Sequence, residues 1–317
     1  MIIERRVARV LGQAEHALFR ASPVILIYHR VNDDDGDLWG VTTPPDLFAE
    51  QIEALKSVRR VVSLPELASA VAERRSSDKP LAAITFDDGY ADVYTVARPI
   101  LERLDCPSTL FLVTDLVDAG REFWWDELAY IFLEVPDLPL SLILSFKRGH
   151  VGWRLEKPGE IAAARHELRR KLRDLTPAQV EDVMGQIRSW AKTEPPARPR
   201  HRVVSSAEVA QLKDGLMRIG AHTARHASMP TLDQRGQCDE AQASRRACEA
   251  LAGEPVETFA YPFGRYDAGS LRAVRQAGFT YACTTVPSTV QPWRDPLRLP
   301  RFAPGRMDAE ALIKALS

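Results

Sequence analysis

The sequence predicts a parallel α/β protein, either a (β/α) barrel or a doubly wound sheet, and two observations support this prediction. Short apolar segments alternate with amphipathic segments along most of the chain, as in proteins whose parallel strands are joined by helices. Polar residues able to carry out chemistry directly follow several of the apolar segments. The 317 residues are 45% hydrophobic, which is enough to bury the core of one large or two ordinary domains.

The first 22 residues are predicted to form an N-terminal helix that precedes a domain over 23–317. Within residues 3–20, apolar side chains recur at helical spacing and four arginines lie among them. Such a helix either rests on a membrane surface or packs on its own domain. Both alternatives stay open from the sequence.

Strands and helices then alternate up to residue 120. Thr43 is expected to cap a helix that begins with Pro44, and Ser63 with Glu66 forms a capping box for the next helix. A further helix is predicted over 92–104. The strands predicted in this half are 24–28, 61–62, 81–86 and 108–113.

The same alternation resumes after residue 200. Ser205 and Glu208 form a capping box, and helices are predicted over 233–252 and 267–277. The strands predicted in this half are 216–221, 258–261 and 281–284.

Residues 120–200 interrupt the alternation and are predicted as a helical insertion. The segment begins with three aromatic residues, Phe123, Trp124 and Trp125, and continues with two charged amphipathic helices. The second helix starts at the Thr176 cap, and a proline-rich linker over 194–199 follows it. Trp125 is a candidate to stack on a sugar ring, and the alternative is that the aromatic cluster attaches the insertion to the barrel.

Composition narrows the range of partners and locations. The net charge is -1, which argues against a nucleic-acid partner. The apolar run over 23–28 is too short to span a bilayer, and no secretory signal is recognised, so a cytoplasmic protein is expected, with peripheral contact to the inner membrane face left open. The four cysteines occur singly and are expected to be reduced core residues. The oligomeric state is not predicted.

Two adjacent carboxylates follow the strand at 81–86 in the sequence AAITFDDGY. Successive residues leaving a strand point in different directions, so Asp87 and Asp88 can serve two distinct roles. The alternative is a helix N-cap with a second acid that the helix dipole favours.

Histidines and a turn follow three other predicted strands. His29 follows the first strand, and His222 with His226 in IGAHTARH has the i, i+4 spacing that puts two imidazoles on one face of a helical turn. In TFAYPFGRYD, Pro262 stiffens a turn and Gly264 permits close backbone approach, so N–H groups there can face a substrate oxygen.

These residues belong on one face if the strands form a barrel, because the strand ends of a barrel carry its active site. One aspartate and two histidines suit a divalent metal with open positions for water and substrate. A second aspartate beside them can act as a general base. The combination predicts a metal-dependent hydrolase.

The motifs TFDDGY, HTARH and YPFG, in this order, resemble those of the polysaccharide deacetylase family, the NodB-homology carbohydrate esterases. ILIYHRV and TTPPDLFAEQIEAL also resemble the segments that lead into the domain in that family. The resemblance covers roughly residues 23–118 and 201–303.

The resemblance implies a distorted (β/α) barrel of the NodB type that binds a divalent metal, usually zinc, with Co²⁺, Ni²⁺ or Mn²⁺ as alternatives. The implied activity is removal of acetyl groups from N-acetylated sugars. It implies that Asp87 is the catalytic base and that Asp88, His222 and His226 bind the metal. The backbone N–H of Phe263 corresponds to the group that holds the oxyanion, and Tyr261, Pro262 and Trp125 are candidates for substrate contacts.

The sequence departs from the family pattern at two places. Ala260 stands where the family often has an arginine that orients the base, and the late Leu-x-His motif that supplies the general acid has no match. His29 is the first candidate for the acid, since an ordinary imidazole has a pKa of about 6.5, and Tyr266 and Asp267 are weaker ones. One alternative is another acyl hydrolysis at the same site, by an O-deacetylase or a deformylase of an amino sugar. The other is a catalytically silent carbohydrate-binding protein, which the missing acid favours. Whether the glycan is polymeric, lipid-linked or nucleotide-linked stays open.

Overall fold

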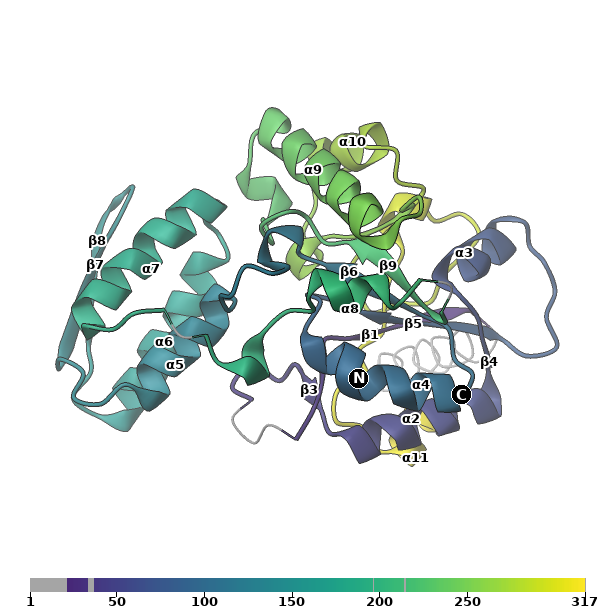
Figure 1. Cartoon of the computed structure of the whole chain (residues 1–317), viewed down its shortest axis with the longest axis horizontal. Helices are drawn as coiled ribbons and strands as arrows, with labels where there is room; N and C mark the ends of the chain where they lie inside the picture. Colours follow the sequence, from purple (N-terminus) through teal and green to yellow (C-terminus); the bar gives the residue numbers. More distant parts are fainter. Residues whose placement is uncertain (1–21, 34–36, 196, 214, 317) are drawn as a thin grey trace, which may run out of the picture.

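The structure is a computed structural model that describes residues 22–33, 37–195, 197–213 and 215–316. The predicted N-terminal helix lies outside the described residues. Figure 1 shows a sheet surrounded by helices, with a smaller lobe beside it.

A parallel sheet of seven strands forms the centre of the larger part, and it contains all seven strands predicted for the barrel. The strands run in the order β1-β5-β6-β9-β10-β11, and β4 pairs with β5 outside this path. Their bounds are β1 (Val24–Tyr28), β4 (Arg60–Val61), β5 (Leu81–Phe86), β6 (Ser108–Leu112), β9 (Met217–Ala221), β10 (Thr258–Ala260) and β11 (Tyr281–Cys283).

An irregular segment over 299–302, which we call the closing segment, closes this sheet into a distorted barrel. Leu299 forms a parallel bridge with Cys283 of β11, and Phe302 forms one with Leu26 of β1. The segment therefore connects the two outermost strands of the sheet. It also carries Arg301, which is 1% exposed, into the interior of the barrel.

Amphipathic helices pack around the barrel; α2, for example, buries Phe48, Ile52 and Leu55 in the main core. The helices are α2 (Pro45–Val58), α3 (Leu64–Ala72), α4 (Arg98–Arg103), α8 (Ser206–Ala210), α9 (Gln234–Ala252), α10 (Ala268–Gln276) and α11 (Ala309–Leu316). Short helical segments are η1 (Val93–Ala97), η2 (Thr114–Leu116), η3 (Pro199–His201), η4 (Met229–Thr231), η5 (Pro262–Gly264) and η6 (Pro296–Arg298). Among the described residues, no helix combines the length and apolar character needed to cross a bilayer.

The start of α2 differs from the prediction. Thr43 does not cap the helix, because it pairs with Val31 in a small parallel sheet formed by β2 (Arg30–Val31) and β3 (Thr42–Thr43). Pro44 occupies the cap position instead. The two capping residues predicted at Ser63 and Ser205 do accept hydrogen bonds from the backbone N–H three residues later.

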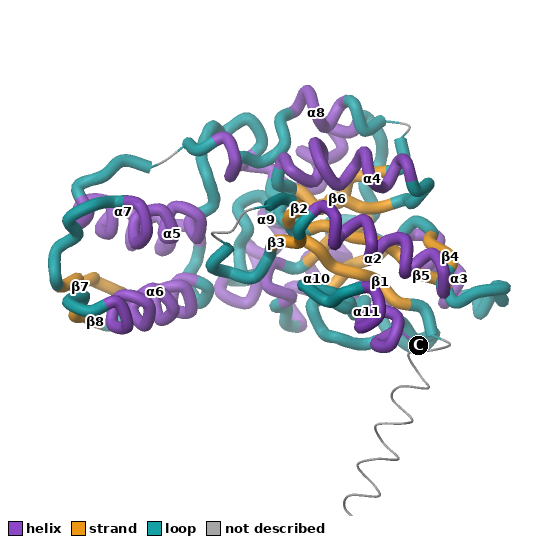
Figure 2. The backbone as a smooth tube through the Cα atoms, turned by 90° about the horizontal axis from the view of Figure 1, so that it is seen from below, coloured by secondary structure: helices purple, strands orange, loops and turns teal. Residues whose placement is uncertain are grey.

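The smaller lobe in Figures 1 and 2 is formed by the segment between η2 and η3. It comprises α5 (Trp124–Glu134), β7 (Ser141–Phe146), β8 (Gly149–Arg154), α6 (Pro158–Leu172) and α7 (Pro177–Ala191). These elements have a hydrophobic core of their own that includes Leu128, Leu168 and Ile187. We call residues 122–198, which make up most of this segment, the insertion lobe.

The insertion lobe is mostly helical, but the β7–β8 hairpin was not predicted. In β7, Leu142 and Leu144 are buried whereas Ile143 is 71% exposed. This alternation is a strand pattern, and Gly149, with φ 121°, ends the turn between the two strands.

Candidate metal and catalytic site

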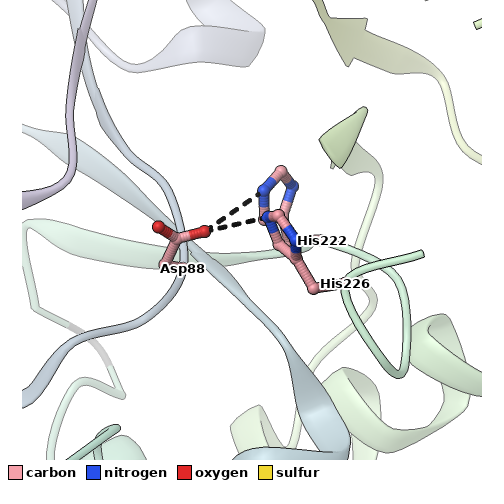
Figure 3. Close-up of side chains that lie close together, drawn as sticks. All are labelled: Asp88, His222 and His226. Atoms are coloured by element: carbon pink, nitrogen blue, oxygen red, sulfur yellow. Dashed lines mark ion pairs between the residues drawn. The ribbon is translucent and has the colours of Figure 1, made fainter. Parts of the chain in front are cut away.

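Three potential metal ligands meet beyond the ends of β5 and β9, the two strands that flank β6. Asp88 follows β5, while His222 and His226 follow β9, and all three are buried. The Asp88 Oδ1 lies 3.5 Å from His222 Nε2 and 3.2 Å from His226 Nε2. Figure 3 shows both imidazoles turned toward the same carboxylate oxygen.

Unusual backbone conformations bring these ligands together. Asp88 has φ 72° and is followed by Gly89 with φ 80°, while Thr223 and His226 have φ 64° and 55°. Non-glycine residues adopt such angles at a cost of about 1–3 kcal/mol each, and they concentrate at functional sites. Two of the three potential ligands, Asp88 and His226, therefore have left-handed backbone, and Thr223 directly follows the third.

The two histidines do not lie on a helical turn, contrary to the prediction from their spacing. The left-handed backbone at Thr223 and His226 breaks the helix, so residues 222–227 form a loop. Buried Glu240 of α9 accepts hydrogen bonds from the backbone N–H groups of Ala224 and Arg225, at 2.9 and 3.1 Å. The Glu240 carboxylate thus holds residues 222–227 in a loop, where the histidine spacing predicted a helical turn.

The histidine rings are oriented for metal binding through Nε2. His222 Nδ1 lies 2.7 Å from the carbonyl oxygen of Ala260, which holds the ring with Nε2 toward Asp88. Burial lowers the pKa of His222, but Asp87 and Asp88 raise it above its ordinary value. Burial lowers the pKa of His226 below its ordinary value, which favours the neutral ring that a metal requires.

The three donors fit a divalent metal. Their ligand atoms all lie within 4.8 Å of one another, and the distances of 3.2 and 3.5 Å match the separation of about 3.3 Å between two tetrahedral ligands of zinc at about 2.0 Å. His226 Nδ1 is buried without a hydrogen-bond partner in the described structure. Imidazole nitrogen and carboxylate oxygen suit zinc and the neighbouring transition metals.

Asp87 lies beside the ligands and is held by Arg301. Two guanidinium nitrogens of Arg301 donate to the two carboxylate oxygens, each at 2.6 Å. Burial raises the pKa of Asp87, but Arg301 and His222 outweigh this and keep it below its ordinary value. Asp87 is therefore ionised, and its Oδ2 lies 3.9 Å from His222 Nε2.

Arg301 supplies the orienting group that the sequence analysis did not identify. Its Nε also donates to the Thr284 carbonyl at 2.8 Å, and one Nη donates to Thr85 Oγ1 at 3.2 Å. It comes from the closing segment and not from the position of Ala260. One signal was available, since Arg301 directly follows the apolar residues Leu299 and Pro300 and a buried arginine needs an acidic partner.

The turn that carries Phe263 has consecutive left-handed residues, with φ 57° at Phe263 and 66° at Gly264. Any side chain at Gly264 is excluded, because its Cβ would lie 2.0 Å from Thr285 Oγ1. In the described part of the chain, the N–H of Phe263 has no acceptor outside its own turn. The Phe263 ring lies 4.6 Å from the His226 ring, which puts the turn beside the metal ligands.

A cavity of about 70 Å³ connects these groups. The residues that line it are Asp87, Asp88, His222, His226, Phe263, His29, Trp39, Val41, Trp124, Trp125, Arg169 and Thr285. Trp125 is 7% exposed, stacks on Phe123 with ring centres 4.3 Å apart, and donates from Nε1 to the Tyr90 hydroxyl at 2.8 Å. One face of its ring is thus covered, and only a small part of the side chain is exposed.

Other candidates for the site lie elsewhere. Tyr261 is fully buried and its hydroxyl donates to the Leu297 carbonyl, so neither it nor buried Pro262 lines the cavity. Asp267 caps α10, because its carboxylate accepts from the Ser270 N–H at 2.7 Å. Tyr266 packs against Tyr261. Of the three candidates for the acid, the structure brings His29 alone to the described cavity.

A distorted (β/α) barrel with this donor set at its strand ends defines a class of metal-dependent hydrolases. The chain belongs to the polysaccharide deacetylase family: the model described as "Polysaccharide deacetylase" matches residues 74–135 and 176–282, more than half of the chain. Enzymes of this family hydrolyse linear amide bonds of acetylated sugars, and this chain is a hydrolase of that class. The unmatched gap falls inside the insertion lobe.

Solved structures share the fold across nearly the whole chain. The Streptococcus pyogenes deacetylase PplD, in complex with acetate, is 18% identical and superposes with a TM-score of 0.60 over 94% of this chain and 99% of its own. IcaB from Ammonifex degensii is 17% identical, with a TM-score of 0.61 and coverage of 94% and 98%. The Bacillus cereus polysaccharide deacetylase BC0361 is 16% identical, with a TM-score of 0.61 and coverage of 93% and 69%. None of the curated proteins compared with the sequence is significantly similar to it.

Proposed function

We propose that the chain removes the acetyl group from an N-acetylated amino sugar and that its metal is zinc, held by Asp88, His222 and His226. The observation that carries this proposal is the set of two imidazoles and one carboxylate within 4.8 Å, with a second carboxylate beside it that is paired with Arg301. A divalent metal bound there supplies Lewis acidity, which makes water a nucleophile near neutral pH.

Asp87 is the general base in this proposal. Its carboxylate is ionised and held in one orientation by Arg301, so it can accept the proton of the attacking water. The N–H of Phe263 donates to the acetyl oxygen, which becomes negative as the water adds. The strained turn fixes the direction of this N–H before the substrate arrives.

His29 is proposed as the general acid. It lines the same cavity as Asp87 and Asp88, and its imidazolium can give a proton to the departing amine, which is a poor leaving group without one. The exposed part of Trp125 is proposed to contact the sugar ring. Tyr261 and Pro262 are buried and do not line the described cavity, so they are proposed to support the turn and not to contact the substrate.

The proposal is tested by measuring metal content and product together. The wild-type protein is expected to retain one zinc per chain, and the His222→Ala/His226→Ala variant to retain none. The zinc-loaded protein is then given N-acetyl, N-formyl and O-acetyl sugars, and the released acids are measured by mass spectrometry. Release of acetate from N-acetyl sugars alone supports the proposal. Full zinc occupancy in the double variant contradicts the ligand assignment, and preferential release of formate or of O-linked acetate contradicts the N-deacetylase assignment.

A further inference from the structure

Three arginines on or directly after helix α6 have the spacing of one helix face, and two of them line cavities at the proposed active site. Arg165, Arg169 and Arg173 are spaced four residues apart, so they lie along one face of the helix. Arg165 is 9% exposed. Arg169 lines the catalytic cavity, and Arg173 lines a second cavity of about 490 Å³ that adjoins it.

The two cavities share His226, Phe263 and Trp124, so they open into the same region beside the metal ligands. The second one lies where the insertion lobe meets the barrel, because it is lined by residues of both. Its volume falls within the range of about 300–1,000 Å³ typical of small-molecule sites. The catalytic cavity of about 70 Å³ admits the acetamido group, and the larger one has room for the rest of the substrate.

Aromatic rings hold both guanidinium groups in place. The Arg169 guanidinium carbon lies 4.5 Å from the centre of the Trp39 ring, and that of Arg173 lies 4.6 Å from the centre of the Phe263 ring. Stacking of this kind uses the flat face of a guanidinium group and leaves its N–H edge available for an acceptor in the plane. The side chains are thus positioned without being neutralised.

Neither Arg169 nor Arg173 has a side-chain hydrogen bond or ion pair within the described part of the chain, and the Nε of Arg173 is buried without a partner. Of the four acids that line the larger cavity, Asp115 is exposed to solvent, and the three glutamates have other partners, as does Asp174 beside Arg173. Arg188 binds Glu127 and Glu181, Arg198 binds Glu122, and Arg265 binds Asp174. Asp37 accepts from the backbone N–H groups of Trp39 and Thr42. Burial, the first cause in each case, lowers the pKa of both arginines, and so does the charge of a neighbouring arginine.

We propose that Arg169 and Arg173 bind a phosphate group carried by the amino-sugar substrate, next to the acetamido group that is hydrolysed. This inference rests on the proposed function, because it names the substrate class of the same site. Two unneutralised guanidinium groups match a phosphate, which carries about -1.5 to -2 charge near pH 7, better than a carboxylate with its single charge. The substrate is accordingly a phosphorylated or diphosphate-linked N-acetyl amino sugar.

The test compares the binding of two sugars by calorimetry to the zinc-loaded full-length protein. N-acetylglucosamine 1-phosphate carries the phosphate, and the methyl glycoside of N-acetylglucosamine lacks it. The wild type is expected to prefer the phosphate sugar by at least about tenfold, since hydrogen bonds to charged groups contribute about 1.5–3 kcal/mol. The Arg169→Gln/Arg173→Gln variant should lose this preference.

A matched control removes the same charge from exposed positions. Arg170 lies on the same helix and Arg246 on α9, and both are exposed, so Arg170→Gln/Arg246→Gln should retain the full preference. Thermal unfolding of each variant verifies that it is folded. Should the glutamine variant fail to fold, Arg169→Lys/Arg173→Lys keeps the charge but not the planar fork and is expected to lose part of the preference.

Three results overturn the proposal: no preference in the wild type, a preference that survives loss of both arginines, or equal affinity for a carboxylated sugar such as N-acetylmuramic acid. Acetate release from both sugars by the wild type is followed in parallel. Its absence with both contradicts the proposed function, whereas release from both with equal affinities contradicts the phosphate subsite alone. A nucleoside-diphosphate sugar and a prenyl-diphosphate sugar form two further arms, and tighter binding of one of them supports the proposal and identifies the carrier.

Discussion

At the scale of single residues, the ionised state of Asp87 depends on Arg301. Because the pKa of Asp87 is lowered by Arg301, the Arg301→Gln substitution should raise it. A general base works only when it is deprotonated, so the acidic limb of kcat/KM against pH should move to higher pH. Arg301→Lys keeps the charge and should move the limb less. An acidic limb that is unchanged in Arg301→Gln would show that Asp87 is not the base or does not depend on this pair.

A second residue-scale prediction concerns His29. If the imidazolium is the general acid, activity falls as it loses its proton at higher pH, and His29→Gln removes this alkaline limb together with most of the turnover. General acid catalysis contributes about 10²–10⁴-fold. The zinc content of the variant should equal that of the wild type, because His29 is not among the grouped ligands. The assignment is wrong if the variant keeps the alkaline limb of the wild-type profile.

At the scale of elements, the loop 222–227 depends on α9 for its shape. Glu240, which is 2% exposed, accepts two backbone N–H groups of the loop and the Arg225 Nε at 2.7 Å. Glu240→Gln keeps the size of the side chain but replaces one carboxylate oxygen, an acceptor, by an amide NH₂ group, which is a donor. Loss of a group that orients a metal ligand typically reduces metal affinity about 10–100-fold, so zinc affinity should fall by this factor.

The control for this prediction is Glu254→Gln, which breaks an exposed pair with Arg218 near the start of β9, at the end of the strand opposite the histidine loop. Its zinc affinity should match that of the wild type. Equal affinities in Glu240→Gln and the wild type would mean that the loop holds its shape without α9.

The elements also show how far the sequence predicts this structure. The strands were predictable because each is a short apolar run with a clear end, as in β1 and β5. The histidine loop was not, since the i, i+4 spacing fits a helical turn and nothing local reveals the left-handed backbone at Thr223. The closing segment was missed because it pairs through single bridges at Leu299 and Phe302, which leave no periodic pattern.

Some parts of the candidate site were likewise predictable from the sequence, and others were not. The motifs around Asp87, Asp88 and the two histidines could be predicted to meet, because strand ends of a barrel share one face. Arg301 and the arginines of α6 could not. They reach the site from segments far along the chain, and their proximity follows only from the folding of the insertion lobe and the closing segment.

At the scale of the whole molecule, the insertion lobe is joined to the barrel where the chain enters and leaves it. Glu122, at the entry, forms several hydrogen bonds with Arg198, at the exit, and their side chains are 2% and 17% exposed. Breaking one partner of a buried ion pair costs about 3–5 kcal/mol. Glu122→Gln is therefore expected to reduce the free energy of unfolding by about this amount, measured by urea denaturation.

Glu134→Gln serves as the comparison, because Glu134 also contacts Arg198 but is 40% exposed. An exposed pair contributes about 0–1 kcal/mol, so this variant should unfold close to the wild type. Equal losses in the two variants would show that burial at the junction does not matter.

The most direct test of the account is acetate release from an N-acetylated amino sugar by the zinc-loaded protein, measured by mass spectrometry with and without the Asp87→Asn substitution. If Asp87 is the base of a zinc-dependent N-deacetylase, one acetate forms for each free amine, the variant retains zinc, and its rate is about 10²–10⁴-fold lower. Release at near wild-type rate from Asp87→Asn, or no release from any N-acetyl sugar by the zinc-loaded wild type, would contradict this assignment.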